Sequence, residues 1–162
     1  MDLRNEVSQP VRIGRMAVIS EVSEEEILIT KINNSCWWHV PPCDRDAYKK
    51  RGKFFASTFA QAEFYGRPND EPERVSIRNP VYGFSEMEIL EKLFTCDQIA
   101  KFDLSAMENG TSPNWYGKRI ALDRKMYLRA KKLGYDAIVL MTPQGKKDLQ
   151  TNRKPRSMEL NL

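Results

Sequence analysis

The sequence has only one histidine, His39, and three cysteines among its 162 residues. An odd number of cysteines without a Cys-x-x-Cys pair argues against a disulfide framework and against a structural zinc site. With one histidine, a metal cluster built from histidine and cysteine ligands is not expected either. We therefore predict that no metal is bound and that the cysteines are thiols of a reducing compartment, by default the cytoplasm.

Long apolar runs are also missing. No segment approaches the roughly 20 apolar residues that a membrane-spanning helix needs. The N-terminal stretch contains acidic side chains and lacks the apolar run of a secretory signal, so we expect none. Neither of the glycine-rich phosphate-binding patterns, G-x-G-x-x-G and G-x-x-x-x-G-K-[ST], occurs. We therefore expect no membrane partner and no nucleotide site of the Rossmann or P-loop kind.

The rest of the composition is that of a globular protein, with 41% hydrophobic and 30% charged residues. Val/Ile-rich or alternating runs predict strands at residues 16–20, 27–32, 36–40, 53–56, 74–78, 137–141 and 158–162. Capping residues and helical spacing predict helices at 44–51, 57–65, 85–94 and 118–133. Because strands and helices alternate irregularly, we predict a single α+β domain over residues 1–162 rather than repeated β-α-β units.

His39 is the first candidate binding residue. It follows Trp37-Trp38 in a strand-like run, where the period of two places Trp37 and His39 on one face. An imidazole beside an aromatic side chain can hydrogen-bond a sugar hydroxyl or an amide. A lone histidine is nevertheless more often a structural residue with satisfied hydrogen bonds, so His39 alone does not indicate a ligand.

A second candidate segment follows shortly afterwards. The apolar run 54–56 ends in Ser57 and Thr58, either of which can cap a helix that carries Tyr65 just before Gly66. Such an arrangement would hold an aromatic ring near the end of a strand. Equally, Ser57 and Thr58 can serve only as helix caps, and Tyr65 can close the helix against the core.

The order of these segments resembles the ADP-ribosyltransferase superfamily, in its histidine–tyrosine–glutamate form found in diphtheria-type toxins and poly(ADP-ribose) polymerases. Phe55-Ala56-Ser57 followed by Ala60 to Tyr65 is similar to the Phe-Ala stretch and spaced tyrosine of the polymerases. Gly134 to Leu140 resembles the strand before the catalytic loop of the family, and Val75 to Pro80 resembles the strand after its aromatic helix. The resemblance covers roughly residues 39–162 and implies the family's split mixed β-sheets with inserted helices.

This resemblance implies NAD as a substrate and a role for each candidate residue. His39 would bond the adenosine ribose and the NAD backbone near the nicotinamide end, and Tyr65 would stack on the nicotinamide ring. Ser57 and Thr58 would brace the site. Glu159 would bond the nicotinamide ribose and stabilise positive charge as nicotinamide leaves. The implied function is mono-ADP-ribosyl transfer to a macromolecular acceptor, a protein or a nucleic acid, by a toxin, an effector or a phage-type host-modifying enzyme.

Several alternatives stay open at this point. Asp148 or Gln150 would take the place of Glu159 if the predicted loop 142–157 were shorter. The basic residues of that loop favour a phosphate-rich or acidic partner, or merely keep the protein soluble. They therefore also suit a non-catalytic binding or inhibitor protein of the same fold. A third hypothesis, an RNA 2′-phosphotransferase of related fold, would need basic residues around an acceptor phosphate.

Overall fold

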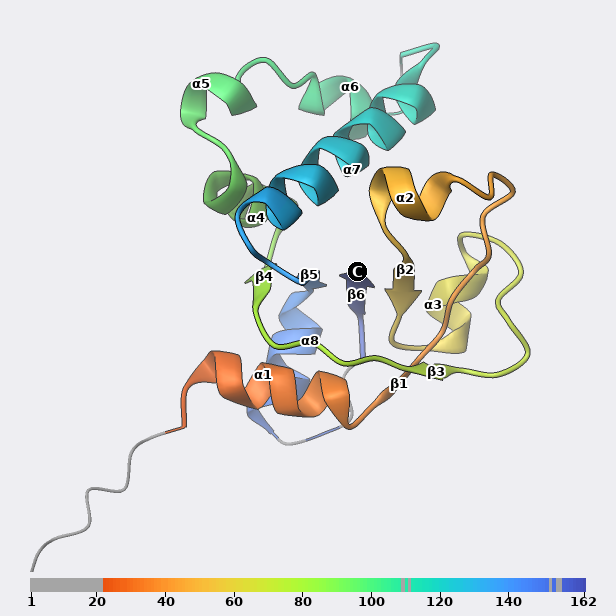
Figure 1. Cartoon of the computed structure of the whole chain (residues 1–162), viewed down its shortest axis with the longest axis vertical. Coiled ribbons are helices and arrows are strands. Elements are labelled where there is room, and N and C mark those ends of the chain that lie inside the picture. The colour runs from red at the N-terminus through yellow and green to blue at the C-terminus, as the bar shows by residue number, and fades with distance from the viewer. Residues whose placement is uncertain (1–21, 109, 111, 152, 154–155) are drawn as a thin grey trace, which may run out of the picture.

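A four-stranded sheet forms the centre of the computed structural model, which describes residues 22–108, 110, 112–151, 153 and 156–162. Its strand order is β2-β6-β5-β4 (Figure 1). The strands are β2 (Phe54–Ala56), β6 (Met158–Asn161), β5 (Ala137–Met141) and β4 (Pro80–Gly83). β6 runs antiparallel to both of its neighbours, whereas β4 and β5 are parallel.

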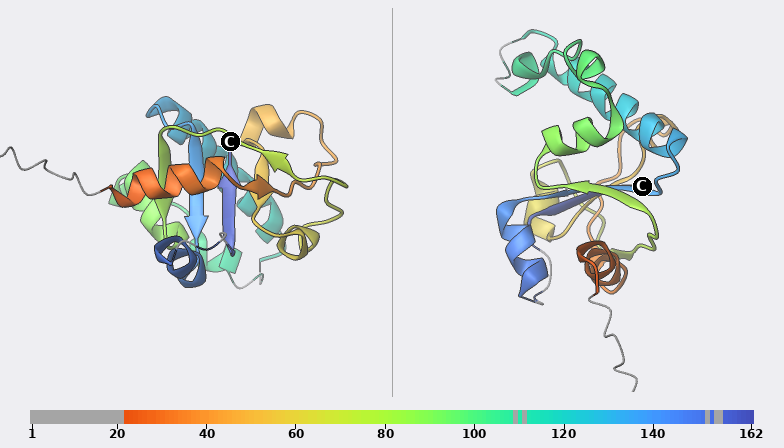
Figure 2. Two further views of the ribbon diagram at one scale, coloured as in Figure 1. Left: turned by 90° about the horizontal axis from the view of Figure 1, so that it is seen from below. Right: turned by 90° about the vertical axis from the view of Figure 1, so that its left-hand side faces the viewer.

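The other elements cover the two faces of this sheet (Figure 2). One face carries α1 (Glu24–Asn33), α8 (Pro143–Gln150) and a small sheet of β1 (Cys36–Trp37) and β3 (Glu73–Arg74). The opposite face carries α4 (Glu86–Leu93) and α7 (Trp115–Lys132), with α5 (Cys96–Ile99) and α6 (Leu104–Glu108) between them in the chain. α2 (Ala47–Arg51) packs against α7, and α3 (Phe59–Glu63) follows β2. The predicted α+β class is therefore confirmed.

Two hydrophobic cores lie on the two faces, and the alternation along the strands assigns each side chain to one of them. Met158 and Leu160 of β6 belong to the core under α1 and α8, as does Val139 of β5. Ile138 belongs to the core under α4 and α7, with Leu140 packed against it. Glu159 lies between Met158 and Leu160 in the sequence, and its side chain therefore points toward the α4 and α7 face.

The strand predicted at residues 27–32 is wrong, because this segment is helix α1. Ser23 accepts a hydrogen bond from the Glu26 backbone and the Glu26 side chain bonds back to Ser23, which satisfies two orphan amides of the first turn. Leu28 and Ile32, four residues apart, are fully buried on one side of the helix. The capping box and this spacing therefore outweigh the β-branched composition. The strand predicted at 16–20 lies outside the described residues.

The predicted loop 142–157 is also wrong in its first half, which forms α8. Thr142 caps this helix and Pro143 occupies its first turn, where a missing amide proton costs nothing. Gly145 is buried. The backbone lies so close that a Cβ added there would be 3.1 Å from the backbone oxygen of Arg156. Residues that usually break a helix thus begin this one.

The remaining predictions differ mainly in their boundaries. Strands β2, β5 and β6 and helices α2, α3, α4 and α7 lie where the sequence predicted them, within a few residues at each end. The strand predicted at 74–78 is only the two-residue β3, and β4 was not predicted.

In the described part of the chain, no helix is both long and apolar enough to cross a membrane.

Candidate functional site

Glu159 occupies a central position of the main sheet although it lies near the chain end. Its strand β6 is hydrogen-bonded on both sides, with Ala56 of β2 and Leu140 of β5 as the register partners of Glu159. Pairing on two edges fixes the backbone at this position, so the strand is not a frayed terminus. The side chain is half-buried on the sheet face that carries α4 and α7.

Tyr65 and Glu159 are brought together by the structure. The Tyr65 hydroxyl donates a 2.7 Å hydrogen bond to Glu159 Oε1. Tyr65 follows α3 and is 62% exposed, so most of its ring remains accessible. Burial of the hydroxyl, together with its bond to the Glu159 carboxylate, raises the pKa of the Tyr65 phenol far above its ordinary value. Tyr65 is therefore a neutral donor at any physiological pH.

Ser57 reaches Glu159 through a third residue, Gln61. The Met158 backbone amide donates to Ser57 Oγ at 3.2 Å, and the Ser57 hydroxyl donates to Gln61 Oε1 at 2.9 Å. Gln61 Nε2 in turn lies 3.5 Å from Glu159 Oε1, which is a weak donor contact. Glu159 Oε1 thus meets two donors from the α3 segment. Among the described residues, no hydrogen bond is made to Glu159 Oε2.

Thr58 contributes to the site as a helix cap. Its side chain accepts a 3.2 Å hydrogen bond from the Gln61 backbone amide, which begins α3. An N-cap of this kind stabilises a helix by typically about 1 kcal/mol. Because α3 has only five residues, the cap is a substantial part of what holds Gln61 and Tyr65 in place.

A small open pocket adjoins Glu159 between the sheet and helices α4 and α7. Its floor is apolar, with Ile138 and Leu140 from β5. Its polar wall consists of Glu86, Arg119 and Asp123. These side chains belong to α4 and α7, so the pocket joins the two helices to the strand that carries Glu159.

Arg119 is held by the two acids of this wall. It donates to Asp123 Oδ1 from Nε at 3.1 Å and from Nη2 at 2.8 Å, and Nη2 also pairs with Glu86. Burial raises the pKa of Asp123, while the adjacent Arg119 charge opposes that rise. Burial alone would lower the pKa of Arg119, but the two carboxylates outweigh it and raise that pKa. The guanidinium is therefore permanently charged.

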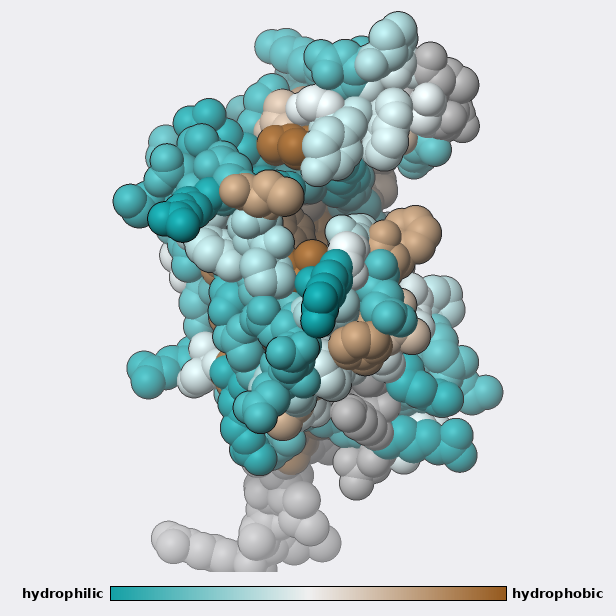
Figure 3. Space-filling model, turned by 90° about the vertical axis from the view of Figure 1, so that its right-hand side faces the viewer, coloured by the Kyte–Doolittle hydropathy of each residue, from teal (hydrophilic) through white to brown (hydrophobic). Residues whose placement is uncertain are grey.

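Partly exposed aromatic side chains come from β2 and from the segments around α3 and β1. Phe54 lines the pocket and is 38% exposed, while Phe64 beside Tyr65 is 86% exposed. Trp38 packs edge to face on Phe59, with ring centroids 4.9 Å apart. On the side of the molecule that carries α2 and α3, hydrophobic side chains emerge among hydrophilic ones (Figure 3). Such rings offer apolar contact area to a ligand without closing the site.

His39 lies apart from this group of side chains. The alternation predicted that His39 and Trp37 share one face. His39 is 3% exposed and Trp37 is fully buried. Its Nδ1 is 2.7 Å from the Phe54 backbone oxygen and its Nε2 is 2.7 Å from the Tyr48 hydroxyl. Since a carbonyl only accepts, Nδ1 carries the proton and Nε2 accepts from Tyr48. Both ring nitrogens are thus occupied, and NAD binding by His39 stays a prediction that requires an exchange of partners.

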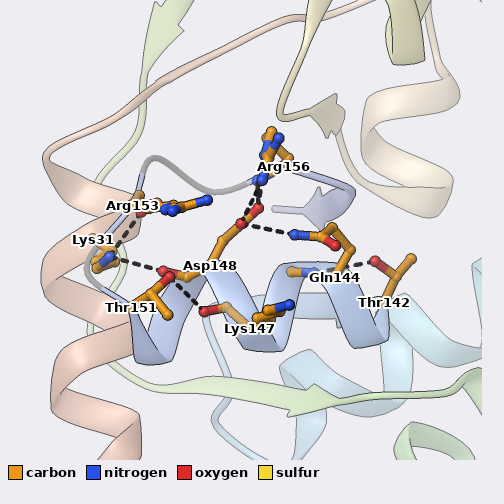
Figure 4. A network of polar contacts seen from close by, with 9 residues as sticks. Lys31, Thr142, Gln144, Lys147, Asp148, Thr151, Arg153 and Arg156 are labelled. Atoms are coloured by element: carbon orange, nitrogen blue, oxygen red, sulfur yellow. Dashed lines mark hydrogen bonds and ion pairs between the residues drawn. The ribbon is translucent and has the colours of Figure 1, made fainter.

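The alternative acid Asp148 has a different environment (Figure 4). It lies on α8, whose Leu149 belongs to the core on the opposite sheet face from Glu159. Its carboxylate is 1% exposed and accepts hydrogen bonds from the Arg156 side chain and backbone and from Gln144. These bonds lower its pKa to about 2. Asp148 is thereby a structural anchor, and Gln150 is an exposed residue at the end of the same helix.

Four side chains of this region escaped the sequence-based prediction: Gln61, Glu86, Arg119 and Asp123. Gln61 lies four residues after Ser57, so a helix beginning at Thr58 brings it back over the strand end. Arg119 and Asp123 form an i,i+4 pair on α7. Both spacings were visible in the sequence. What the sequence did not reveal is that α4 and α7 pack over the sheet on the side of Glu159.

The described residues contain no metal site, and the comparisons with known proteins assign no family to the chain. The three cysteines are free, and the described residues include no group of three or more His, Cys, Asp or Glu placed to hold a metal ion. Comparison of the chain with protein-family models, with curated proteins and with solved structures finds no match. Function therefore has to be inferred from the geometry around Glu159.

Proposed function

We propose that this protein is a mono-ADP-ribosyltransferase of the histidine–tyrosine–glutamate type, with the fold of that superfamily. It would cleave NAD and transfer ADP-ribose to a macromolecular acceptor, acting in the cytoplasm of its own cell or of a host as a toxin, an effector or a phage-type modifying enzyme. The observation that carries this proposal is the 2.7 Å contact between Tyr65 and Glu159. These two residues lie 94 positions apart in the chain, and the resemblance to the family assigns both of them to the nicotinamide end of NAD.

The geometry suits the chemistry of breaking the bond between nicotinamide and ribose. The nicotinamide takes the bonding electron pair as it leaves, and positive charge develops at the ribose carbon. A carboxylate fixed beside that carbon stabilises the charge more in the transition state than in the ground state, which accelerates the reaction. The acceptor nucleophile then forms the new bond to the same carbon and loses its proton.

Each described side chain has a role in this proposal. Glu159 Oε1 is held by Tyr65 and Gln61, so Oε2 is left to accept a hydrogen bond from the nicotinamide ribose. The exposed Tyr65 ring can stack on nicotinamide while its hydroxyl keeps the bond to Glu159, a contact that contributes roughly 0.5–1.5 kcal/mol beyond area burial. Ser57 and Thr58 would support these residues from the end of β2 and need not touch NAD.

His39 fits a supporting role better than a direct one. Its bonds connect the backbone of β2 with Tyr48 of α2, and they place the start of β2 next to the aromatic residues around the site. A direct bond to the NAD ribose would require the Tyr48 hydroxyl to give way. We therefore assign His39 to the architecture of the site, and Glu159 and Tyr65 to ligand contact.

The test compares Glu159→Gln with Asp148→Asn. Wild-type protein is incubated with NAD labelled in its adenylate part and a cell lysate, while nicotinamide release is followed by chromatography. We expect Glu159→Gln to keep its stability and to lose about 10²- to 10³-fold in nicotinamide release. Asp148→Asn should keep its activity per folded molecule but lose about 1–3 kcal/mol in free energy of unfolding, because the paired buried charge is removed.

Two results would contradict the proposal. One is a wild-type protein that binds NAD yet neither releases nicotinamide nor labels any component of the lysate. The other is full activity of Glu159→Gln. The first result makes the non-catalytic binding protein the better explanation of the fold, and the second removes Glu159 from the catalytic role.

A further inference from the structure

The positive charge of the molecule is concentrated on two adjacent helices. α2 and α7 together contain ten of the 26 Lys and Arg residues but only one of the 22 Asp and Glu residues. α2 packs against α7, so the two basic helices lie side by side (Figure 1). The rest of the chain is correspondingly acidic, since the net charge of the whole protein is only +4.

Part of this charge is neutralised by the protein, and part is not. Arg119 binds Asp123 and Glu86, Lys118 binds Asp103, and Lys50 binds Asp44. By contrast, four exposed side chains of α7 have no acidic partner within the described part of the chain: Arg124, Lys125, Lys131 and Lys132. Lys125 and Lys131 lie over the rings of Phe102 and Tyr127, which leaves their charges available.

These basic residues follow one row of the helix. Positions four apart lie next to each other on a helix surface, so one row of α7 consists of Tyr116, Ile120, Arg124, Leu128 and Lys132. The tyrosine and the two basic residues alternate in this row with two apolar residues, and Lys131 adjoins its C-terminal end. We name Arg124, Lys131 and Lys132 the basic ridge. Tyr116, at the N-terminal end of this row, is 60% exposed and packs edge to face against Trp115, which is 42% exposed.

We propose that the basic ridge, with Tyr116 at its end, binds single-stranded nucleic acid. Charges in a row match a phosphate backbone, and exposed aromatic rings beside them provide stacking platforms for unpaired bases. A folded acidic protein would need no such platform. RNA and DNA share this phosphate and base chemistry, and the experiment separates them.

The pocket beside Glu159 orients such a strand. Arg119 and Asp123 face the pocket from α7, the same helix that carries the ridge. The pocket contains three carboxylates against one guanidinium and therefore repels phosphates. The backbone would follow the outer ridge, with sugars and bases turned toward the pocket. Binding of the strand does not depend on the proposed function. We also assign the bound strand as the acceptor of ADP-ribose, and this assignment rests on the proposed function.

The experiment measures the anisotropy of a fluorescein-labelled 20-nucleotide strand, as RNA and as DNA, without NAD at low salt. The double variant Arg124→Glu/Lys131→Glu is compared with Lys147→Glu/Arg153→Glu, which changes the charge equally on exposed residues of the opposite side. We expect at least tenfold weaker binding for the ridge variant and less than threefold for the control. The slope of log affinity against log salt should fall by about 2 for the ridge variant only.

Tyr116→Ala tests the stacking part of the proposal. It should weaken single-strand binding about tenfold and leave the salt slope unchanged. The proposal is overturned if neither strand binds, if both double variants lose affinity equally, or if Tyr116→Ala has no effect. It is also overturned if anionic phospholipid vesicles or a poly-glutamate peptide compete as well as the unlabelled strand. If the protein binds the strand but transfers no label from NAD, the proposed binding site stands and only the assignment of the strand as acceptor is refuted.

Discussion

The orientation of the Gln61 amide follows from its neighbours. Ser57 Oγ accepts from the Met158 amide, so its one hydrogen is free for Gln61. That hydrogen needs an acceptor, which must be Gln61 Oε1, and the Gln61 amino group is then turned toward Glu159. The fully buried backbone of β6 therefore sets the direction of a polar chain that ends at the candidate catalytic carboxylate.

This chain predicts the effect of Gln61→Glu. The variant has nearly the same shape and keeps the acceptor for Ser57, but it replaces a donor 3.5 Å from Glu159 by a carboxylate. Two adjacent carboxylates raise the pKa of at least one of them. We expect the acidic limb of the pH profile of kcat/KM to move upward by about one pH unit, with little change in KM for NAD. Gln150→Glu, on an exposed turn of α8, is the matched control and should leave the profile unchanged.

An unchanged pH profile of kcat/KM in Gln61→Glu would mean that Gln61 does not contact Glu159 in solution.

At the scale of elements, the sequence was most informative where one local signal dominated. The Ser85 cap, the Gly134 stop and the apolar run 137–141 each define an element, and α4, α7 and β5 occur there. Prediction was poorer where two local signals competed. In α1 the β-branched residues favour a strand, yet the Ser23–Glu26 box and burial at 28 and 32 decide for a helix.

The same distinction applies to the candidate site. Ser57, Thr58, Tyr65 and Glu159 belong to elements that the sequence located, and the structure brings them into one group. The alternation placed His39 on the same face as Trp37, and the structure shows that this face is buried. The partners of His39, Phe54 and Tyr48, come from elements whose packing no pattern reveals. The pocket wall of Glu86, Arg119 and Asp123 likewise depends on the packing of α4 and α7 over the sheet.

The end of α2 offers a test of how closely the elements are packed. Gly52 has a φ of +80°, and a Cβ added there would lie 2.0 Å from Asn161 Oδ1. Gly134 has a φ of +88°, but a Cβ added there meets nothing within 4 Å. Gly134→Ala should therefore show only the backbone cost, about 1 kcal/mol. Gly52→Ala adds a steric clash and should lose about 3 kcal/mol or more.

Urea unfolding at pH 7.5 measures the free energy of unfolding of both glycine variants and of the wild type. The comparison holds the backbone conformation nearly constant and varies only the surroundings of the Cβ. Equal losses in the two variants would mean that Gly52 does not lie against β6.

At the scale of the whole molecule, the two faces of the sheet have different roles. The face under α1 and α8 carries a core whose central side chains, such as Leu28 and Trp37, are fully buried, together with the Asp148 anchor. The other face carries Glu159, the acidic pocket and the basic helices α2 and α7. Changes on the first face should affect stability, and changes of the exposed and pocket-lining residues on the second face should affect binding and reaction.

His39 makes the stability of the whole fold depend on pH. Burial lowers its pKa below the ordinary value, although the bond to the Phe54 oxygen opposes this shift. The unfolded chain therefore takes up a proton on His39 at a higher pH than the folded protein does. Stability that is present above about pH 6.5 is then lost as the pH falls toward the folded-state pKa. Asp148 adds a loss of the same sign, but only between about pH 4 and pH 2.

We expect the free energy of unfolding of the wild type, measured in urea at pH 7.5, 6.5 and 5.5, to decrease as the pH falls. His39→Asn lowers stability at pH 7.5 by removing the bond to Tyr48, but it should flatten the pH dependence because no imidazole remains. Tyr48→Phe removes the same hydrogen bond and keeps the imidazole, so its pH dependence should persist. The raised pKa of Asp123 changes stability with pH in the opposite direction. All three proteins contain Asp123, so its contribution cancels when their pH dependences are compared. A slope in His39→Asn equal to that of Tyr48→Phe would show that a group other than His39 controls stability in this range.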